Sequence, residues 1–428
     1  MQKPSSRPTI PGPPSRRTLI AAAVCGAPFT VGAAGAAAAP ARPGPELAPP
    51  AEVQPGAAGY EHPGLLHTAS DLEEMSVRVE SGASPWAQGY ERLAANGHAG
   101  ADWQARPLQT VVRGGDGQNY MQLALDIHAA YQNALRWRLT GASEHGAAAV
   151  GILNGWASTL SAISGNADRF LAAGIYGYQL ANAAELLHDH PELDKAGVQD
   201  LLLQVFYPLN DDFLTNHNDS VITNYWANWD LCTMASVLAI GVFTDREDLV
   251  DRAVTYFQDG EGNGSILHAI PFVYDDENLA QWQESGRDQG HSIMGIGLMA
   301  AFCEMAWSQG IDCWGHDDNR FLKAAEYVAK YNLGHDVPFT EYTWQSGPSS
   351  TPPHVGWQTH TEISGTARGQ QRPVWELILA HYAGRRGLEA PWVEEMVGTL
   401  RPEGGGGDYG DTSGGYDQLG FGTLSASA

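Results

Sequence analysis

The stretch NYMQLALDIHAAYQNALRWRLTG, residues 119–141, decides the fold class. Its apolar residues, such as Leu123 and Ile127, recur at three- and four-residue steps, the pattern of one helix face, and Gly141 marks the helix end. A second run of this kind, SEHGAAAVGILNGWASTL at residues 143–160, follows almost at once. Two helices with so short a connection lie antiparallel, so the sequence predicts a helical hairpin.

The same periodicity continues along the rest of the chain. We expect further helices at about residues 167–189, 193–207, 226–242, 245–258, 287–308, 318–332, 368–386 and 389–400. No convincing alternation of β-branched residues, which would be typical of strands, interrupts them. The pattern predicts an all-α chain, an α/α toroid that forms an incomplete barrel of about six or seven antiparallel hairpins. A superhelical repeat scaffold is the alternative.

Two stretches, residues 258–286 and 333–367, are too long for simple connections. They hold many polar and aromatic side chains, and loops on a rigid scaffold often carry binding residues. We expect them to border a substrate cleft.

The composition narrows the class of protein. The 428 residues suffice for one large domain, and 13 Trp and 16 Tyr are typical of extracellular carbohydrate-active proteins. With 24 Lys and Arg against 49 Asp and Glu, the formal charge is −25. A general nucleic-acid binder needs a basic face to neutralise phosphates, so that class is excluded.

The N-terminus indicates export. Arg16 and Arg17 precede a run of small and apolar residues that extends to Ala39 and ends in Ala-Pro-Ala, so residues 1–41 are predicted to be a twin-arginine signal. A membrane anchor is the alternative, but the run lacks the density of Leu, Ile and Val of a stable span. Residues 42–60 are a Pro- and Ala-rich linker, and 61–428 the toroid domain. The mature chain is expected to be secreted or periplasmic and not bound to a membrane.

Cysteine and metal-ligand patterns indicate no cofactor. Cys232, Cys303 and Cys313 remain after signal cleavage, and their spacing matches no zinc site or disulfide framework. Buried free thiols are the ordinary interpretation. No His-Glu-x-x-His motif occurs, so we expect no metal. Nothing in the sequence indicates an oligomeric state.

The segment WQESGRDQGHS, residues 282–292, carries the strongest signal for chemistry. Ser285 and Asp288 have capping-box spacing, which predicts a helix that starts after Gly286. Arg287 and His291 then lie one turn apart on one face. The alternative is a surface pair of Glu284 with the arginine and an incidental histidine.

A second segment, TNYWANWD at residues 223–230, places amides and rings on adjacent helix faces. Asn224 and Asn228 are one turn apart, as are Tyr225 and Trp229. Amides suit a sugar carboxylate or hydroxyl, and flat rings suit stacking on a pyranose. The alternative is a packed aromatic helix start. A third segment, residues 354–372, contains His360, and there a structural loop is as good an interpretation as a site.

Together these segments resemble the alginate-lyase superfamily. The resemblance rests on ALRWRLTG at 134–141, LANAAELL at 180–187, NYW at 224–226 and ESGRDQGH at 284–291. It covers residues 61–428 and is strongest to polysaccharide lyase family 38, with a more distant similarity to family 5. It implies an α/α toroid that cleaves a 1,4-linked uronate polymer, alginate or glucuronan, by β-elimination. The implied partner is an anionic polysaccharide, and no metal is required.

The resemblance also implies roles for residues. Arg287 corresponds to the arginine that stabilises charge, and Asn224 to the amide that holds the uronate carboxylate. Family 5 has an Asn-His pair before Tyr-Trp and a Tyr two turns after the arginine, whereas here no His precedes Tyr225 and the latter position is Met294. We therefore expect His291 to be one member of the acid–base pair, with His268, Tyr274, Tyr342 or His360 as the other. The expected substrate-binding residues are Asn228, Tyr225, Trp226, Glu284, Gln289, His360 and Tyr274.

Two other functions fit the same helical scaffold. A glycoside hydrolase would use two carboxylates, Glu284 with Asp230 or Glu362. A non-catalytic glycan-binding protein would keep the aromatic residues without the base. For the lyase, we expect Arg287, Arg368 and Arg372 to form a positive strip inside an acidic shell and activity to rise with moderate salt.

Overall fold

The computed structural model describes residues 59–410 and 415–426. The predicted export signal lies outside these residues, as does all of the predicted linker except residues 59 and 60. Both therefore stay predictions. Within the described residues, no helix combines the length and the apolar character needed to cross a bilayer.

Six helical hairpins make up most of the described residues, and in each of them the two arms pack together. Their helices are α1 (Ala69–Glu80) with α2 (Trp86–Ala94), α3 (Met121–Thr140) with α4 (Ser143–Thr159), α5 (Asp168–Glu185) with α6 (Lys195–Leu201) and α7 (Tyr207–Asn216), α8 (Ala227–Phe243) with α9 (Glu247–Asp259), α11 (Gln289–Ser308) with α12 (His316–Asn332), and α13 (Trp375–Leu379) with α14 (Pro391–Leu400). The first two predicted arms, residues 119–140 and 143–160, are confirmed almost to the residue.

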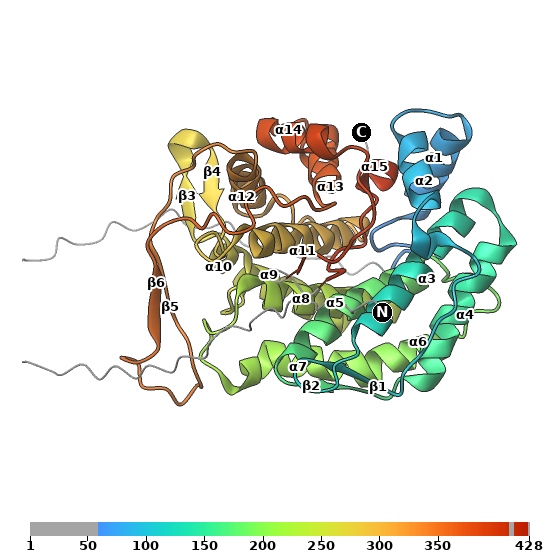
Figure 1. Cartoon of the computed structure of the whole chain (residues 1–428), viewed down its shortest axis with the longest axis horizontal. Helices are drawn as coiled ribbons and strands as arrows, with labels where there is room; N and C mark the ends of the chain where they lie inside the picture. Colours follow the sequence, from blue (N-terminus) through green and yellow to red (C-terminus); the bar gives the residue numbers. More distant parts are fainter. Residues whose placement is uncertain (1–58, 411–414, 427–428) are drawn as a thin grey trace, which may run out of the picture. The chain divides into compact units, whose positions relative to one another are not determined.

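The first helices of successive hairpins pack against one another. Helix α3 packs on α5, α5 on α8, and α8 on α11, and α13 packs on α11 in turn. Figure 1 shows α5, α8 and α11 side by side in the middle of the chain, with the remaining helices around them. The short C-terminal helix α15 (Gly422–Ser425) contacts α1, α2 and α13 and so joins the first hairpin to the last. The predicted α/α toroid is confirmed.

Burial explains why the central helices are so apolar. Every residue of α8 except Trp229 is buried, and α11 is buried from Ser292 to Ala306. A helix that is apolar all round must be surrounded by others, as the inner helices of a toroid are. The start of each inner helix can then hold the few polar side chains that face the interior.

Three short two-stranded sheets were not predicted. They are the parallel pair β1 (Thr110–Arg113) and β2 (Ala162–Gly165), and the antiparallel pairs β3 (Phe272–Tyr274) with β4 (Leu279–Gln281) and β5 (Tyr342–Gln345) with β6 (Trp357–His360). Strands of three or four residues are too short to show an alternating pattern. Both long irregular stretches of the sequence contain one of the antiparallel pairs.

Two predicted helix boundaries are wrong for local reasons. The helix predicted to end near residue 207 continues to Asn216 through the π-turn Leu202–Phe206. Pro208 offers no N–H and its ring crowds the preceding turn, and the wider π-turn accommodates it. The helix predicted from residue 368 begins only at Trp375, after Pro373, and ends in a second π-turn, Ala380–Arg385.

The remaining elements are single turns: η1 (Gly97–Ala99), η3 (His217–Asp219), α10 (Ile266–Ala269) and η4 (Asp275–Glu277). The three cysteines of the described residues are buried and free, as expected.

Candidate active site

The segment that carries Arg287 turns sharply between β4 and α11. The backbone N–H of Arg287 donates to the carbonyl oxygen of Glu284 at 2.8 Å, and α11 begins two residues later. The N-cap is Asp288, whose Oδ1 accepts from the backbone N–H of His291 at 2.8 Å. The predicted start directly after Gly286 is therefore wrong. Asp288 has the extended backbone of a cap residue, and Ser285 is buried in the preceding turn.

Arg287 is held in place and still reaches solvent. Its Nη1 donates to Oε1 of Glu284 at 2.9 Å and its Nη2 to Nε2 of His291 at 3.1 Å. The centre of the guanidinium lies 5.2 Å from the ring centroid of Trp226. Because 27% of the side chain is exposed, the fixed cation can meet an anionic ligand.

The other ring nitrogen of His291 contacts a carboxylate. Its Nδ1 lies 2.7 Å from Oδ2 of Asp288, and 13% of the His291 side chain is exposed. Burial by itself would raise the pKa of Asp288, but the hydrogen bonds and the charge of His291 outweigh it and hold the pKa below its ordinary value. Asp288 therefore stays a carboxylate beside the imidazole.

Glu284 is buried beneath the guanidinium with no exposed surface. Burial raises its pKa, although the nearby charges of Arg287 and His291 act in the opposite direction. Its Oε2 has no partner in the described part of the chain, and the same holds for three buried polar atoms in adjoining segments: Ser285 Oγ, Asn228 Oδ1 and His360 Nδ1. Buried polar groups are normally paired, so such a group of unpaired atoms is typical of a site for a polar ligand or water.

An aromatic wall, Trp226, Trp344 and His360, borders Arg287. The imidazole of His360 stacks on Trp226 at 5.7 Å and 11°, and Trp344 lies 4.9 Å from Trp226. Trp344 and His360 come from the β5–β6 hairpin. Burial and the charge of Arg287 both lower the pKa of His360, which is therefore neutral near pH 7.

Gly286 allows the hairpin to come this close. A Cβ at position 286 would lie 2.5 Å from Cβ of His360, well inside the van der Waals limit. Any side chain at this position would therefore push His360 away from Arg287.

Asn224 is tied to the same hairpin. Its Oδ1 accepts from the backbone N–H of Gly347 at 2.8 Å, and the neighbouring Thr223 hydroxyl donates to the carbonyl of Gln345 at 2.7 Å. Within the described residues, the Asn224 amide nitrogen has no partner. The contact with Gly347 thus fixes the amide so that its N–H groups remain available.

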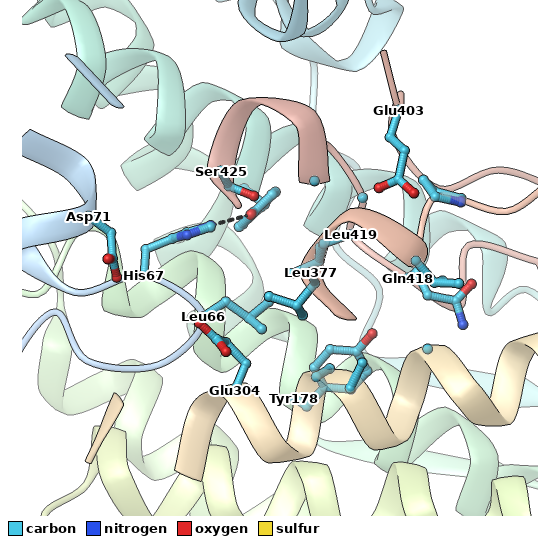
Figure 2. Close-up of a pocket in the computed structure, with 18 of the residues that line it drawn as sticks. Leu66, His67, Asp71, Tyr178, Glu304, Leu377, Glu403, Gln418, Leu419 and Ser425 are labelled. Carbon is cyan, nitrogen blue, oxygen red and sulfur yellow. Dashed lines mark hydrogen bonds between the residues drawn. The ribbon is translucent and has the colours of Figure 1, made fainter. Parts of the chain in front are cut away.

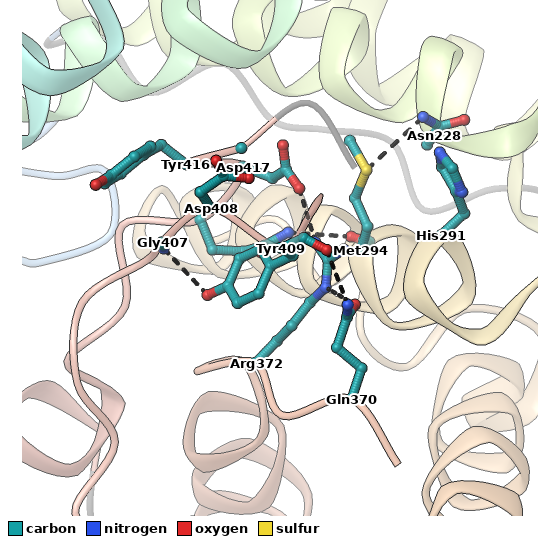
Figure 3. A network of polar contacts seen from close by, with 12 residues as sticks. Asn228, His291, Met294, Gln370, Arg372, Gly407, Asp408, Tyr409, Tyr416 and Asp417 are labelled. Carbon is teal, nitrogen blue, oxygen red and sulfur yellow. Dashed lines mark hydrogen bonds and ion pairs between the residues drawn. The ribbon is translucent and has the colours of Figure 1, made fainter. Parts of the chain in front are cut away.

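Asn228 faces α11 from α8. It is buried, and its amide nitrogen donates to Sδ of Met294 at 3.8 Å. Figure 3 shows Asn228 beside His291 and Met294. The amides at 224 and 228 therefore contact different neighbours, the hairpin and α11, although they are one turn apart in sequence.

Three predicted binding residues have their polar groups occupied within the fold. The Tyr225 hydroxyl accepts from the Asn218 amide at 2.8 Å. The Gln289 amide donates to the carbonyl oxygens of Ser285 and Ser364, and the Tyr274 hydroxyl donates to Gln281 at 2.7 Å. The structure thus brings together Arg287, His291, Glu284, Trp226 and His360 but gives Tyr225, Gln289 and Tyr274 structural partners.

The contacts of the remaining candidates for the second acid–base residue show which of them lies near Arg287. Tyr342 pairs with His360 across the hairpin, but it is buried and its hydroxyl bonds to the Gln283 amide at 3.0 Å. His268 is exposed and bonds to Ser265 at 3.0 Å. Only His360 borders Arg287.

The predicted positive strip is not formed. Arg372 is fully buried and pairs with Asp417 at 2.7 Å (Figure 3). Arg368 donates to the carbonyl oxygens of Tyr331 and His335 at 2.7 and 2.9 Å. Arg372 is thus neutralised by a buried carboxylate, as a buried guanidinium must be. Arg368 is exposed, but backbone carbonyl groups take up its N–H donors.

One of the two carboxylate pairs of the hydrolase alternative, Glu284 with Asp230, has a partner that the fold already occupies. Asp230 is fully buried and bonds to His217 at 2.8 Å and to Tyr256 at 3.0 Å. Both of its oxygens are occupied, since the other accepts from the backbone N–H of Gly264.

The sequence did not reveal three residues that shape the site. Trp344 lies in a stretch expected to border a cleft, but nothing marked that side chain. Asp288 was read only as part of a cap, and Gly286 only as a turn. The one available signal was the pair Ser-Gly directly before Arg287, which is typical of a close approach by another segment.

The best-defined cavity lies elsewhere. It has a volume of about 60 Å³ and lies between α1, α11, α13 and the C-terminal segment (Figure 2). His67, Tyr178, Glu304, Glu403 and Gln418 contribute to its lining, and none of the residues around Arg287 does. Among the described residues, no cluster of His, Cys, Asp or Glu side chains could hold a metal ion.

Comparisons with known proteins place the chain in a family. The alginate lyase family profile matches residues 80–337, more than half of the chain. A search of curated proteins found no match.

Solved structures show the same fold at low identity. Alginate lyase A1-III from Sphingomonas species A1 has 13% identity and a TM-score of 0.52, over 87% of this chain and 98% of that one. A variant of A1-III complexed with a tetrasaccharide has 14% identity and a TM-score of 0.55, over 87% and 97% of the two chains. An alginate lyase from Bacteroides ovatus has 14% identity and a TM-score of 0.51, over 80% and 96%. The chain belongs to the alginate lyase family and is a polysaccharide lyase.

Proposed function

We propose that this protein cleaves alginate, a 1,4-linked uronate polymer, by β-elimination at the site around Arg287. The observation that carries the proposal is the contact at 3.1 Å between a partly exposed guanidinium and an imidazole whose other nitrogen faces a carboxylate. A cation and a base in contact are what this reaction requires. The tetrasaccharide complex of a structural relative supports an oligosaccharide as ligand.

The first step is neutralisation of the substrate carboxylate. The C5 proton of a uronate is only weakly acidic, because a carboxylate next to the developing carbanion disfavours further negative charge. Arg287 and Asn224 would bind that carboxylate, the first through its partly exposed guanidinium and the second through its amide N–H groups. Glu284 holds the guanidinium in place at 2.9 Å, so it need not reorganise when charge develops.

The second step moves a proton and breaks the glycosidic bond. Nε2 of His291 takes the C5 proton, a double bond forms between C4 and C5, and the bond from C4 to the glycosidic oxygen breaks. The imidazolium that forms on His291 then gives this proton to the leaving oxygen, to which the N–H of His360, a neutral imidazole bordering the same guanidinium, donates a hydrogen bond. The products are a fragment with a new reducing end, whose hydroxyl is the former glycosidic oxygen, and a fragment whose new non-reducing end is an unsaturated uronate.

The test is formation of the conjugated double bond, followed by ultraviolet absorbance. The purified protein is incubated in parallel with alginate, polymannuronate, polyguluronate and glucuronan. We expect absorbance to rise with alginate, and the response to the two homopolymers will identify the preferred unit. New reducing ends without the ultraviolet signal would mean hydrolysis and would overturn the proposal, as would the absence of any product.

Arg287→Ala makes the test specific to this site. We expect a loss of at least about 1,000-fold in kcat/KM, because the charge of the uronate is no longer neutralised. The matched control is Arg246→Ala, which removes an exposed arginine paired with Asp248. Full activity in Arg287→Ala would remove this arginine from the mechanism.

We also propose that the protein is exported by the twin-arginine route. The support is the Arg16-Arg17 pair and the small apolar run after it. Replacement of both arginines by lysine should keep the chain inside the cell, as measured by cell fractionation. Unchanged export of this variant would contradict the assignment.

A further inference from the structure

The two carboxylate oxygens of Asp288 make different contacts. Oδ1 accepts from the backbone N–H of His291 at 2.8 Å and caps α11, whereas Oδ2 lies 2.7 Å from Nδ1 of the same residue. The carboxylate therefore contacts both the backbone and the imidazole of His291. A serine or threonine could provide the cap alone, because a cap needs one acceptor. The second oxygen is available for another role.

The other side of the imidazole meets only donors. Nε2 lies 3.1 Å from Nη2 of Arg287, and a guanidinium has no acceptor. In the neutral ring, Nε2 must therefore carry the lone pair and Nδ1 the proton, which is donated to Asp288. We infer that Asp288 is a positioning residue that fixes the tautomer of His291, so that Nε2 is the proton acceptor for the substrate.

The surroundings of the imidazole support this assignment. The charged groups near it are Arg287, Asp288 and the buried Glu284. From α8, the group that faces this part of α11 is the Asn228 amide, which bonds to Met294 and carries no charge. Only 9% of the Asp288 side chain is exposed, so water competes little for the Oδ2 contact.

This inference rests on the proposed function and adds a residue to it. When the substrate carboxylate binds Arg287, the lone pair of Nε2 becomes free to face the C5 proton. The imidazolium that forms is stabilised by the adjacent carboxylate. Asp288 itself need not gain or lose a proton.

Asp288→Asn tests the tautomer with little change in shape. With the amide oxygen as the cap, the amide N–H₂ group replaces Oδ2 and donates to Nδ1. The proton of the ring then moves to Nε2, which can no longer act as a base. Asp288→Ser is the companion variant, because it keeps one acceptor for the cap and removes the second. Asp194→Asn, at the cap of α6, is the control for the same change away from the site.

Two readouts separate positioning from a merely structural role. NMR of the imidazole nitrogens, with His291 assigned by loss of its signal in His291→Gln, reports the tautomer directly. We expect the Nδ1–H form in the wild type and its loss in Asp288→Asn, whose amide donates to Nδ1. The second readout is the split between kcat and KM: kcat should fall because the base is lost, and KM should stay within a few-fold because Arg287 is kept. Activity should fall by at least about 100-fold in Asp288→Asn and remain unchanged in Asp194→Asn.

The inference is overturned if the wild type shows the Nε2–H form, or if Asp288→Asn keeps the Nδ1–H form. A raised KM with an unchanged kcat would also overturn it and leave Asp288 as a helix cap only. A wild-type protein without activity on any uronate would refute the proposed function, whereas the NMR result would still decide the tautomer.

Discussion

Two His–Asp pairs in this protein have almost the same distance between partners, but they use different ring nitrogens and have different surroundings. In the pair at the start of α11, His291 lies 2.7 Å from Asp288, and in the pair at the start of α8, His217 lies 2.8 Å from Asp230. The side chains of the first pair are 13% and 9% exposed and those of the second 4% and 0%. The distance between the partners does not distinguish them.

The second contact of each imidazole distinguishes the two pairs. Nε2 of His217 already bonds to Asp230 and lies 3.1 Å from the Tyr256 hydroxyl, so the ring is enclosed by protein partners. Nε2 of His291 meets a partly exposed arginine that a ligand can draw away. A saturated pair supports the fold, whereas a pair with a releasable partner can take part in a reaction.

The largest expected effect is a difference in activity between variants of the two histidines. His291→Gln should lower kcat/KM by about 1,000-fold, since a general base contributes factors of this size. His217→Gln should leave the activity of the folded fraction within a few-fold of the wild type. Initial rates of double-bond formation, corrected for the folded fraction by circular dichroism, check both. Equal losses in the two variants would mean that the comparison has no functional meaning.

The next prediction concerns the free energy of unfolding. Here we expect the larger loss at the pair in α8 and the smaller loss at His291. Asp230→Ala leaves the His217 ring, the Tyr256 hydroxyl and the Gly264 N–H without their acceptor in a buried site. We expect a loss of about 3 kcal/mol in the free energy of unfolding. His291→Gln should lose less than about 1 kcal/mol, because the Gln amide can still donate to Asp288 and the partly exposed Arg287 can bond to water. Urea unfolding measures both, and a stability loss concentrated in His291→Gln would reverse the assignment.

Much of this fold could be predicted from sequence, because hydrophobic periodicity reports directly on helix faces. The Leu123–Ile127 spacing and the stop at Gly141 gave the first hairpin, and Arg287 and His291 were placed on one face by their four-residue separation alone. These are local relations, and the backbone of a helix determines them.

The remainder of the site depends on contacts between distant segments. Trp344 reaches Trp226 only because the β5–β6 hairpin folds back, and no local pattern encodes that. Tyr225 and Gln289 looked like binding residues because their partners, Asn218 and Ser364, come from other turns of the chain. Polar side chains at a helix start look the same in sequence whether a ligand or the fold occupies them.

A smaller effect on activity tests how the β5–β6 hairpin contributes to the site around Arg287. Gly286→Ala would place a Cβ 2.5 Å from Cβ of His360 and displace the imidazole. We expect kcat/KM to fall by about ten- to a hundred-fold, the range for misplacement of a catalytic group. The control is Gly151→Ala in α4, where a Cβ would meet nothing within 4 Å, so activity should stay unchanged. Wild-type activity in Gly286→Ala would exclude His360 from the reaction.

The smallest effect is the pH dependence of stability. The pKa of Asp288 lies below its ordinary value in the folded protein, so the carboxylate stabilises the fold above its unfolded-state pKa. That contribution is lost as the pH falls through the folded-state value. Between about pH 6 and about pH 3, the wild type should therefore lose more unfolding free energy than Asp288→Asn. Equal losses in urea unfolding would contradict this coupling.

The most direct test of the account is a crystal structure of His291→Gln with an alginate oligosaccharide bound. We predict that a uronate carboxylate lies within hydrogen-bond distance of the Arg287 guanidinium and the Asn224 amide, with C5 of that sugar facing position 291. A sugar chain bound away from Arg287, or one whose carboxylate points away from it, would contradict the assignment of this site.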